Sequence, residues 1–287
     1  MAGTLYMVAT PIGNLEDLTF RAKRILGEVD VIAAEDTRRT SHLLAHYQIK
    51  KPMVSLREHN ESREASRLVA KILAGASVAV VTDAGTPGIA DPGARMVNAA
   101  RAAGITVVPI PGASAVSTAM SVSGSLVPEF TFLGFPPAKG EDRNRWFHRM
   151  AAFDHPVVFF EAPHRIERTV ADTEEILVKK HILVLRELTK INETVVIRPN
   201  NGHFEDIKPI GEFCVVVIPR FEGSAAAISE DLLQGQALKL FTQLVSGGQV
   251  SDDFAIELIA LKLAVSEGEA RKAVKKAKIS VKQQKTL

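Results

Sequence analysis

Residues 80–88 read Val-Val-Thr-Asp-Ala-Gly-Thr-Pro-Gly, and this stretch decides the fold. The apolar run that enters it, residues 77–82, is rich in β-branched side chains and predicts a strand buried on both faces. Residues 83–93 then hold three Gly and two Pro, which neither a strand nor a helix interior accommodates well. A loop of this composition at the carboxyl end of a buried strand is where an open α/β sheet binds its ligand.

The same loop has a simpler interpretation as a plain connection between a strand and a helix. Its last residues, Asp91-Pro92-Gly93, also resemble a helix start. Glycines, however, let backbone N–H and C=O groups approach a small molecule closely. We therefore favour a ligand-binding loop and keep the plain connection as the alternative.

Similar turns follow the other strands predicted in the first part of the chain. Strand, turn and helix alternate five times up to residue 120, which predicts a parallel sheet with helices on both faces. Because the carboxyl ends of parallel strands lie along one edge, the turns should gather there and form a crevice. The turns are residues 11–14, 35–40, 57–60, 83–88 and 111–115. The predicted helices are residues 15–28, 41–47, 61–73 and 94–103, and one that runs from the last turn to residue 120.

The second part of the chain predicts a more antiparallel α/β domain. It follows a linker at residues 121–128, and residues 190–192 join an antiparallel pair. The predicted strands are residues 130–135, 157–160, 181–186, 193–198 and 211–218.

The last part of the chain predicts short helices at residues 232–245 and 254–264, and then a basic helix. Ser266 as N-cap with Glu269 three residues later forms a capping box at the start of the basic helix. These helices would suit a helix-turn-helix-like appendage or a dimerisation tail. We therefore predict an α/β fold in three parts: a parallel-sheet domain over residues 1–123, a mixed-sheet domain over 124–221 and a small helical region over 222–287.

The composition of the chain limits the classes of protein to which it can belong. A chain of 287 residues that is 46% hydrophobic can bury the cores of two domains. Its single cysteine, Cys214, excludes an internal disulfide and a cysteine-based metal site, and we expect it to pack within a strand. The sequence has no secretory signal and no apolar run of membrane-spanning length, so we expect a soluble, cytoplasmic protein.

The charge is unevenly distributed. Residues 262–287 carry eight Lys or Arg against two Glu, a net charge of +6 in a chain whose total is +2. A basic tail on a mildly acidic body suggests an anionic partner. A solvated terminus without a partner is the equally good alternative.

Most familiar catalytic motifs are missing from the sequence. The eight His are scattered and none pairs with the cysteine, so we expect no metal site; His59 and His164 are the two beside other candidate site residues. Residues 10–14 read Thr-Pro-Ile-Gly-Asn rather than Gly-x-Gly-x-x-Gly, which disfavours a nicotinamide site. The residues alone predict a small-molecule crevice with Arg-rich flanks and do not name the ligand.

A series of motifs resembles a known protein family, and this resemblance indicates the ligand. In chain order, these motifs resemble the tetrapyrrole-methylase superfamily and, within it, the ribosomal RNA small-subunit methyltransferase I group. The resemblance extends over residues 4–217, with a weaker match beyond. The motifs are Ala-Thr-Pro-Ile-Gly-Asn-Leu at 9–15, Ala-Ala-Glu-Asp-Thr-Arg at 33–38, Asp-Ala-Gly-Thr-Pro-Gly at 83–88, Asp-Pro-Gly at 91–93, Pro-Gly-Ala-Ser-Ala at 111–115, Phe-Glu-Ala-Pro-His-Arg at 160–165 and Arg-Glu-Leu-Thr-Lys at 186–190.

This resemblance implies a homodimeric, S-adenosylmethionine-dependent enzyme that 2′-O-methylates a cytidine ribose in the decoding centre of 16S rRNA. Its partner would be the rRNA or the small ribosomal subunit. The cofactor would lie folded between the two domains, held largely by backbone groups. Carried over by position, its contacts would be Pro11, Thr82, Asp83, Thr86, Pro87, Ser114, Ala115, Glu161 and Leu188.

The reaction needs a group that accepts the hydroxyl proton and cations that hold the RNA. The candidates for the base are Glu35, Asp36, His59, Glu187 and Lys190, of which the lysine would need a lowered pKa. The candidates for phosphate contacts are Arg38, Arg39, Lys139, Arg143, Arg145 and Lys190.

Two of these assignments have structural alternatives. Trp146 could stack on an RNA base, but core packing is the interpretation that we favour. Asp36 and Arg38 could instead form an internal salt bridge that shapes their loop.

Two other functions remain open. A methylase of tetrapyrroles or other small molecules would have the same fold but a broad apolar acceptor cleft and no need of a basic tail. A non-enzymatic rRNA-binding or assembly factor would bind ribosomal subunits without consuming the cofactor.

Overall fold

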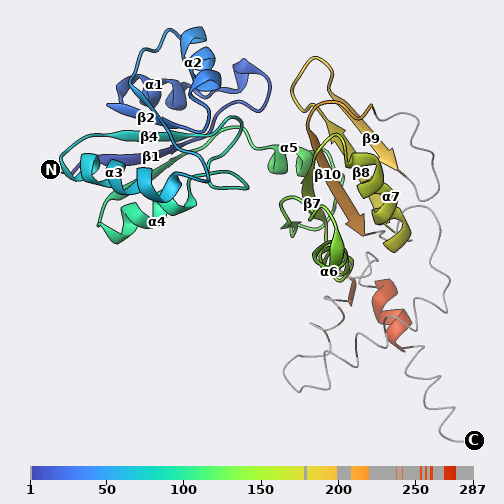
Figure 1. The fold of residues 1–287 in the computed structure, drawn as a ribbon. Coiled ribbons are helices and arrows are strands. Elements are labelled where there is room, and N and C mark those ends of the chain that lie inside the picture. Colours follow the sequence, from blue (N-terminus) through green and yellow to red (C-terminus); the bar gives the residue numbers. More distant parts are fainter. Residues whose placement is uncertain are drawn as a thin grey trace, which may run out of the picture. The chain divides into compact units, whose positions relative to one another are not determined.

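The computed structural model describes residues 2–177, 180–198 and 208–219, and further along the chain residues 237, 241, 253, 256, 259, 260 and 268–275. The chain divides into two compact units, Met1–Pro219 and Arg220–Leu287. The first unit contains two five-stranded sheets, each with a buried core (Figure 1). The predicted α/β fold, with one parallel and one mixed sheet, is confirmed.

The first sheet is entirely parallel and has the strand order β3-β2-β4-β1-β5. Strand β4 lies at its centre, and all of its residues are buried, as expected from the β-branched run. The strands are β1 (Thr4–Val8), β2 (Val31–Ala34), β3 (Met53–Ser55), β4 (Val78–Val81) and β5 (Thr106–Ile110).

Helices cover both faces of this sheet. Val78 and Val80 of β4 belong to the core cluster on the side of α3 and α4, whereas Ala79 and Val81 belong to the cluster on the side of α1 and α2 (Figure 1). This alternation is the period of two that a strand imposes. The helices are α1 (Phe20–Glu28), α2 (Thr37–His46), α3 (Glu61–Leu73) and α4 (Ala94–Ala102).

Two helix starts differ from the sequence prediction because local caps set them. Helix α2 begins at Thr37 rather than at residue 41, since the Asp36 carboxylate accepts a hydrogen bond from the Arg38 amide at 2.8 Å. The predicted helix over residues 15–28 is split into a 3₁₀ turn, η1 (Leu15–Asp17), and α1, whose N-cap Thr19 accepts from the Ala22 amide. Arg38 and Arg39 therefore lie in the first turn of a helix and not in a loop.

The second sheet has the order β6-β7-β10-β8-β9. Strands β6 and β7 are parallel, and the other pairs are antiparallel, as predicted. The strands are β6 (Thr131–Phe132), β7 (Val157–Glu161), β8 (Lys180–Arg186), β9 (Thr194–Arg198) and β10 (Phe213–Pro219).

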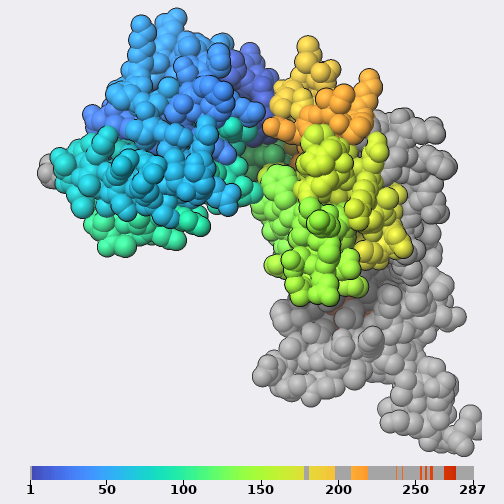
Figure 2. Space-filling view, viewed as in Figure 1, coloured from blue at the N-terminus to red at the C-terminus, as the bar shows by residue number. Residues whose placement is uncertain are grey.

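One face of this sheet packs against α6 (Gly140–Ala151) and α7 (Ile166–Ile176), which lie side by side (Figure 2). The sequence analysis did not predict α7. Helix α5 (Ala115–Ser121), which we assigned to the N-terminal domain, contacts β7 and β10 of the second sheet. The boundary at residue 123 stays a prediction.

The described residues of the second unit are helical, and their apolar side chains form a small cluster. The ion pair Arg271–Asp253 at 2.9 Å joins two parts of this unit. The predicted N-cap Ser266 and the tail from residue 276 lie outside the described residues. Among the described residues, no helix has the length and apolar character that crossing a bilayer requires.

Candidate active site

Two of the predicted turns meet at the carboxyl edge of the first sheet. Thr10, after β1, and Gly85, after β4, exchange backbone hydrogen bonds of 2.9 and 3.0 Å, and the Thr10 hydroxyl donates to the Thr82 carbonyl at 3.1 Å. Gly85 has φ +75, a conformation that favours glycine. The turns therefore gather as the strand–turn–helix alternation predicts.

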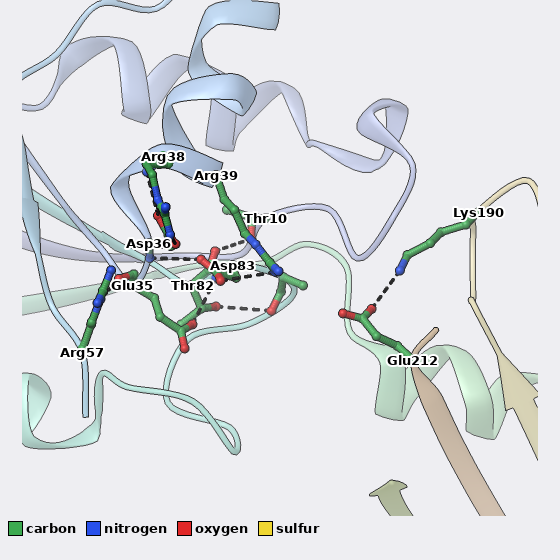
Figure 3. Close-up of polar contacts among 11 residues, drawn as sticks. Thr10, Glu35, Asp36, Arg38, Arg39, Arg57, Thr82, Asp83, Lys190 and Glu212 are labelled. Atoms are coloured by element: carbon green, nitrogen blue, oxygen red, sulfur yellow. Dashed lines mark hydrogen bonds and ion pairs between the residues drawn. The ribbon is translucent and has the colours of Figure 1, made fainter. Parts of the chain in front are cut away.

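Asp83 joins the loop after β4 to the start of α2. Its amide donates to the Glu35 carboxylate at 3.2 Å, and its own carboxylate accepts from the Asp36 amide at 3.0 Å. Arg39 completes the set with an ion pair to Asp83 at 3.3 Å, and Figure 3 shows these side chains converging. Both oxygens of Asp83 are thus engaged by groups of the protein.

A cavity of about 320 Å³ opens beside this network, and both sheets contribute to its walls. The loop after β4 and the start of α5 form one side, and the ends of β7, β8 and β10 form the other. Apolar side chains, among them Phe135, Phe160, Leu185 and Leu188, line much of it. Its volume lies at the lower end of the range for small-molecule sites.

The charged groups of this cavity are mainly acidic. Five acidic residues line it together with Arg39: Glu35, Asp83, Asp91, Glu161 and Glu212. Burial, and then repulsion from Glu35, Asp83 and Glu212, raises the pKa of Asp91 to about 7. Burial also raises the pKa of Glu35, and the hydrogen bond from the Asp83 amide opposes this shift. The cavity therefore favours a cationic ligand.

A strained loop after β8 closes one side of the cavity. Glu187 and Thr189 have φ of 53 and 68, and Leu188 between them is buried against the cavity. The Thr189 hydroxyl accepts from the Asn14 amide at 3.0 Å, which connects this loop to the turn after β1. Non-glycine residues in this conformation are uncommon and cluster at functional sites.

The loop also holds Lys190 between two carboxylates. Its ammonium group lies 2.8 Å from Glu187 and 3.0 Å from Glu212, a contact visible in Figure 3. Burial alone would lower the pKa of Lys190, but the hydrogen bonds that its ammonium group donates to both carboxylates outweigh burial, and the pKa is raised. A catalytic base would need the opposite shift, so the structure does not support Lys190 in that role. The same ion pair lowers the pKa of Glu187.

Six of the predicted cofactor contacts line this cavity: Asp83, Thr86, Ser114, Ala115, Glu161 and Leu188. Pro11 and Thr82 instead line a second cavity of about 310 Å³, which shares Arg39, Asp83 and Glu212 with the first. Pro87 is buried and is not among the residues that line either cavity.

Glu161 has no free carboxylate to offer a ligand. Its fully buried side chain accepts from the Thr169 hydroxyl at 2.6 Å, from Arg165 at 2.6 Å and from the Ala162 amide at 2.7 Å. A contact from this residue would therefore come from its backbone or its aliphatic atoms.

The other predicted bases differ in position. Glu35 lines the first cavity. Asp36 caps α2, and hydrogen bonds from the side chain and the amide of Arg38 lower its pKa strongly. His59 and His164 are exposed and do not line either cavity.

The predicted phosphate contacts also separate into groups. Arg39 is exposed and lines both cavities. Arg38 is exposed and pairs with Asp36 at 2.9 Å, the internal salt bridge that we considered as the alternative. Lys139 and Arg145 are exposed near the start of α6, where Arg145 pairs with Asp142.

The prediction for Arg143 is wrong. Its side chain is only 4% exposed and pairs with Asp172 at 2.7 Å, while it also donates to the Thr169 hydroxyl and the Pro137 carbonyl. We predicted a phosphate contact, but this arginine points into the core between α6 and α7. Trp146 is likewise a core residue, packed edge-on against Phe159.

The sequence analysis missed several cavity residues. Asp91 was noted only as a possible helix start, although it follows the glycine-rich loop directly. Phe135 and Glu212 fall within the predicted strands at residues 130–135 and 211–218 and were not singled out. His42 lies one helical turn beyond Arg39 on α2 and lines the second cavity. Cys214 packs in β10 as expected, where burial raises its pKa to about 12, and it also lines the first cavity.

Comparisons with known proteins agree with this geometry. Residues 4–200 match the family model of the tetrapyrrole (corrin/porphyrin) methylases. A protein from Synechocystis sp. named ribosomal RNA small subunit methyltransferase I is 40% identical over 259 residues, which is 89% of this chain and 93% of that protein. The protein of the same name from Haemophilus influenzae is 40% identical and covers 94% of this chain and 91% of its own length.

Solved structures show the same fold at low sequence identity. Diphthine synthase superposes with a TM-score of 0.59 at 15% identity, over 76% of this chain and 90% of its own. Uroporphyrin-III C-methyltransferase from Thermus thermophilus, solved in complex with S-adenosylhomocysteine, superposes with a TM-score of 0.51 at 18% identity. The match covers 75% of this chain and 97% of that protein.

The chain uses S-adenosylmethionine as its cofactor, and the first cavity fits this molecule. Phe135, Phe160 and Leu185 provide an apolar wall for a purine ring, and the acidic side suits a sulfonium and an ammonium group. Among the described residues, no cluster of His, Cys, Asp or Glu has the make-up of a metal site. The chain belongs to the tetrapyrrole methylases and, among them, to the ribosomal RNA small subunit methyltransferase I group.

Proposed function

We propose that the chain transfers a methyl group to the 2′-oxygen of a cytidine ribose in the decoding centre of 16S rRNA. The observation that carries this proposal is the similarity to proteins named ribosomal RNA small subunit methyltransferase I over nine-tenths of the chain. The structural neighbours with other substrates share only 15–21% identity and support the fold alone.

The second cavity supports an RNA acceptor rather than a tetrapyrrole. Arg39, His42 and Lys190 line it, together with the hydroxyl residues Thr10 and Thr40. Cations and hydroxyl groups are the usual partners of RNA phosphates and riboses. A tetrapyrrole acceptor would instead require a broad apolar cleft.

In this proposal the first cavity holds the cofactor, which supplies an activated methyl group, and the second admits the ribose. The Asp83 network fixes the boundary between the two cavities, since Asp83, Arg39 and Glu212 line both. Holding two reactants in a productive geometry can supply up to about 7–11 kcal/mol of the barrier reduction. Arg38, Arg39, Lys139 and Arg145 would contact phosphates farther along the RNA.

We also propose that the chain forms a homodimer and works in the cytoplasm. Strand β9 exposes Val195 and Ile197 by 43% and 63%, while Val196 between them packs against the core. An exposed apolar stripe of this kind favours association. Light scattering of the full chain should give twice the monomer mass; a monomer at micromolar concentration would contradict the homodimer.

The deciding experiment uses the full chain, methyl-labelled S-adenosylmethionine and small ribosomal subunits that lack the modification. Label mapped to one cytidine ribose supports the proposal, and label on a base or on a small molecule contradicts it. Binding of subunits without label transfer would favour a non-enzymatic factor. Parallel reactions with naked 16S rRNA identify the form of the substrate.

A further inference from the structure

Asp91 differs from the other carboxylates of the first cavity because no described residue forms a hydrogen bond or ion pair with it. Glu35 accepts from the Asp83 amide, Asp83 is held by Arg39 and the Asp36 amide, and Glu212 pairs with Lys190. Each of these three is fixed by the protein, and so is Glu161, which Arg165 and Thr169 hold.

The structure also shows why Asp91 is free. Its position before Pro92 and Gly93 suggests a helix cap, but α4 begins at Ala94 with Gly93 as its N-cap. The buried carboxylate of Glu61 accepts from the amides of Gly93, Arg95 and Met96 at 2.9–3.1 Å and so satisfies the helix start. Asp91 therefore has no structural task in the helix that follows it.

The groups that face Asp91 come from three elements. Glu35, at the end of β2, Asp83, after β4, and Glu212, before β10, are acidic and repel its charge. Arg39 of α2 is the cation that lines the same cavity, and Asp83 holds it. Asp91 lies partly buried beside this network. Asp83 and Glu212, whose charges act on it, line both cavities, so Asp91 lies near the boundary at which a ribose in the second cavity would meet the cofactor in the first.

We propose that Asp91 accepts the proton of the substrate hydroxyl during methyl transfer, an inference that rests on the proposed function. The hydroxyl oxygen forms its new bond to the methyl carbon as the carbon–sulfur bond breaks and leaves its electron pair on sulfur. The O–H bond breaks, its electron pair stays on oxygen, and the proton moves to the Asp91 carboxylate. A base is most effective when its pKa lies near the working pH, and the pKa of about 7 meets this condition.

The test compares Asp91→Asn and Asp91→Glu with the wild type and with the control Asp154→Asn. Asp154 is 73% exposed and does not line either cavity. We expect Asp91→Asn to lower single-turnover rates at about pH 8 by about 10²–10⁴-fold, the usual contribution of a general base. The wild-type rate should fall as the pH drops below about 7, because Asp91 becomes protonated. Asp91→Glu should keep this fall of the rate at acidic pH, with its midpoint at a different pH. Asp91→Asn should show no such fall.

Binding measurements separate this role from that of a cofactor contact. Glu35, Asp83 and Glu212 remain in Asp91→Asn to face the sulfonium and ammonium groups. Titration calorimetry of this variant should therefore give dissociation constants for S-adenosylmethionine and S-adenosylhomocysteine within about threefold of the wild type. Loss of affinity for both ligands, or for the charged one alone, would overturn the proposal and make Asp91 a cofactor ligand. An unchanged rate and an unchanged fall of the rate at acidic pH in Asp91→Asn would also overturn it.

The same experiment distinguishes failure of the proposed function. If the wild type transfers no label to the ribose, both proposals fail. If it transfers label normally and Asp91→Asn does so equally well, only the assignment of Asp91 fails.

Discussion

Gly13 and Lys190 approach so closely that a Cβ atom on Gly13 would lie 2.4 Å from Cγ of Lys190. The same atom would be 2.8 Å from the Thr189 hydroxyl and 3.0 Å from the Leu188 carbonyl. The Asn14 amide donates to that hydroxyl, so the turn after β1 and the loop after β8 are in direct contact. A residue without a side chain is needed where these two loops meet beside the cavities.

We therefore expect Gly13→Ala to weaken cofactor binding. The added methyl group would push the loop at residues 188–190 away, and Leu188 lines the first cavity. A tenfold increase in the dissociation constant of S-adenosylhomocysteine corresponds to about 1.4 kcal/mol, and we expect a loss of about this size by titration calorimetry.

Gly27→Ala is the matched control for this substitution. Gly27 lies in α1, and a Cβ atom there would meet nothing within 4 Å. Alanine in a helix is favoured over glycine by about 0.5–1 kcal/mol, so this variant should unfold at a slightly higher temperature and bind the cofactor normally. Equal affinities of the two variants would show that the contact at Gly13 does not shape the cavity.

The sequence predicted the first sheet well because its signals are local. Each strand is a short run that contains β-branched residues, and each is followed by Gly, Pro or charged residues, so strand, turn and helix could be separated by composition. The bounds of α3 were predicted as observed, at Glu61–Leu73. Helix α2 was placed too late because the cap Asp36 was assigned to a loop, and α7 was missed.

The site was harder to predict because its chemistry depends on contacts between distant residues. Nothing near Arg143 in the chain indicates that Asp172, 29 residues later, holds it in the core. The carboxylate that caps α4 belongs to Glu61, 32 residues before Gly93, and this contact is what leaves Asp91 free. The motifs identified the loops around the cavity, whereas the protonation and pairing of individual side chains required the fold.

Arg143→Ala should destabilise the protein without a specific loss of RNA binding. Removing one partner of a buried ion pair costs about 3–5 kcal/mol, and the partial exposure of Asp172 reduces this to about 2–3 kcal/mol. For a chain of this size we expect a fall in the unfolding temperature of roughly 5–10 °C, measured by calorimetry. Below that temperature its affinity for rRNA should match the wild type.

Arg145→Ala is the control on the same helix. Arg145 and its partner Asp142 are each 72% exposed, and such pairs contribute at most about 1 kcal/mol. Its unfolding temperature should stay within about 2 °C of the wild type. If Arg143→Ala were equally stable but bound rRNA more weakly, the assignment of Arg143 to the core would be refuted.

Arg39→Ala should weaken rRNA binding in a salt-dependent way. Arg39 lines both cavities and is exposed, so a phosphate can compete with Asp83 for its guanidinium group. Losing one phosphate contact should reduce the slope of log affinity against log salt concentration by about 0.7–0.9. Arg24→Ala, which removes an exposed arginine paired with Glu28 on α1, should leave the slope unchanged. An unaltered slope in Arg39→Ala would exclude the phosphate contact.

Asp91→Asn should stabilise the ligand-free protein at high pH. The pKa of Asp91 is about 7 in the folded chain against 3.8 for the unfolded reference, so the folded state binds more protons between these values. Its stability therefore falls as pH rises from about 4 to 7, and the deficit stays constant above that. The asparagine variant lacks this penalty and should gain about 1 kcal/mol at pH 8, a value discounted for the partial exposure of the side chain.

Denaturant unfolding at several pH values measures this difference. The advantage of Asp91→Asn over the wild type should shrink toward zero as the pH falls below about 4, where Asp91 becomes protonated in the unfolded state as well as in the folded one. The exposed carboxylate of Asp154 lies 3.5 Å from His155, and exposed pairs contribute at most about 1 kcal/mol. Asp154→Asn should therefore differ from the wild type by less than about 0.5 kcal/mol at every pH. A constant difference between Asp91→Asn and wild type at every pH would mean that the substitution acts through packing, and that the carboxylate of Asp91 is not held in a repulsive, partly buried environment.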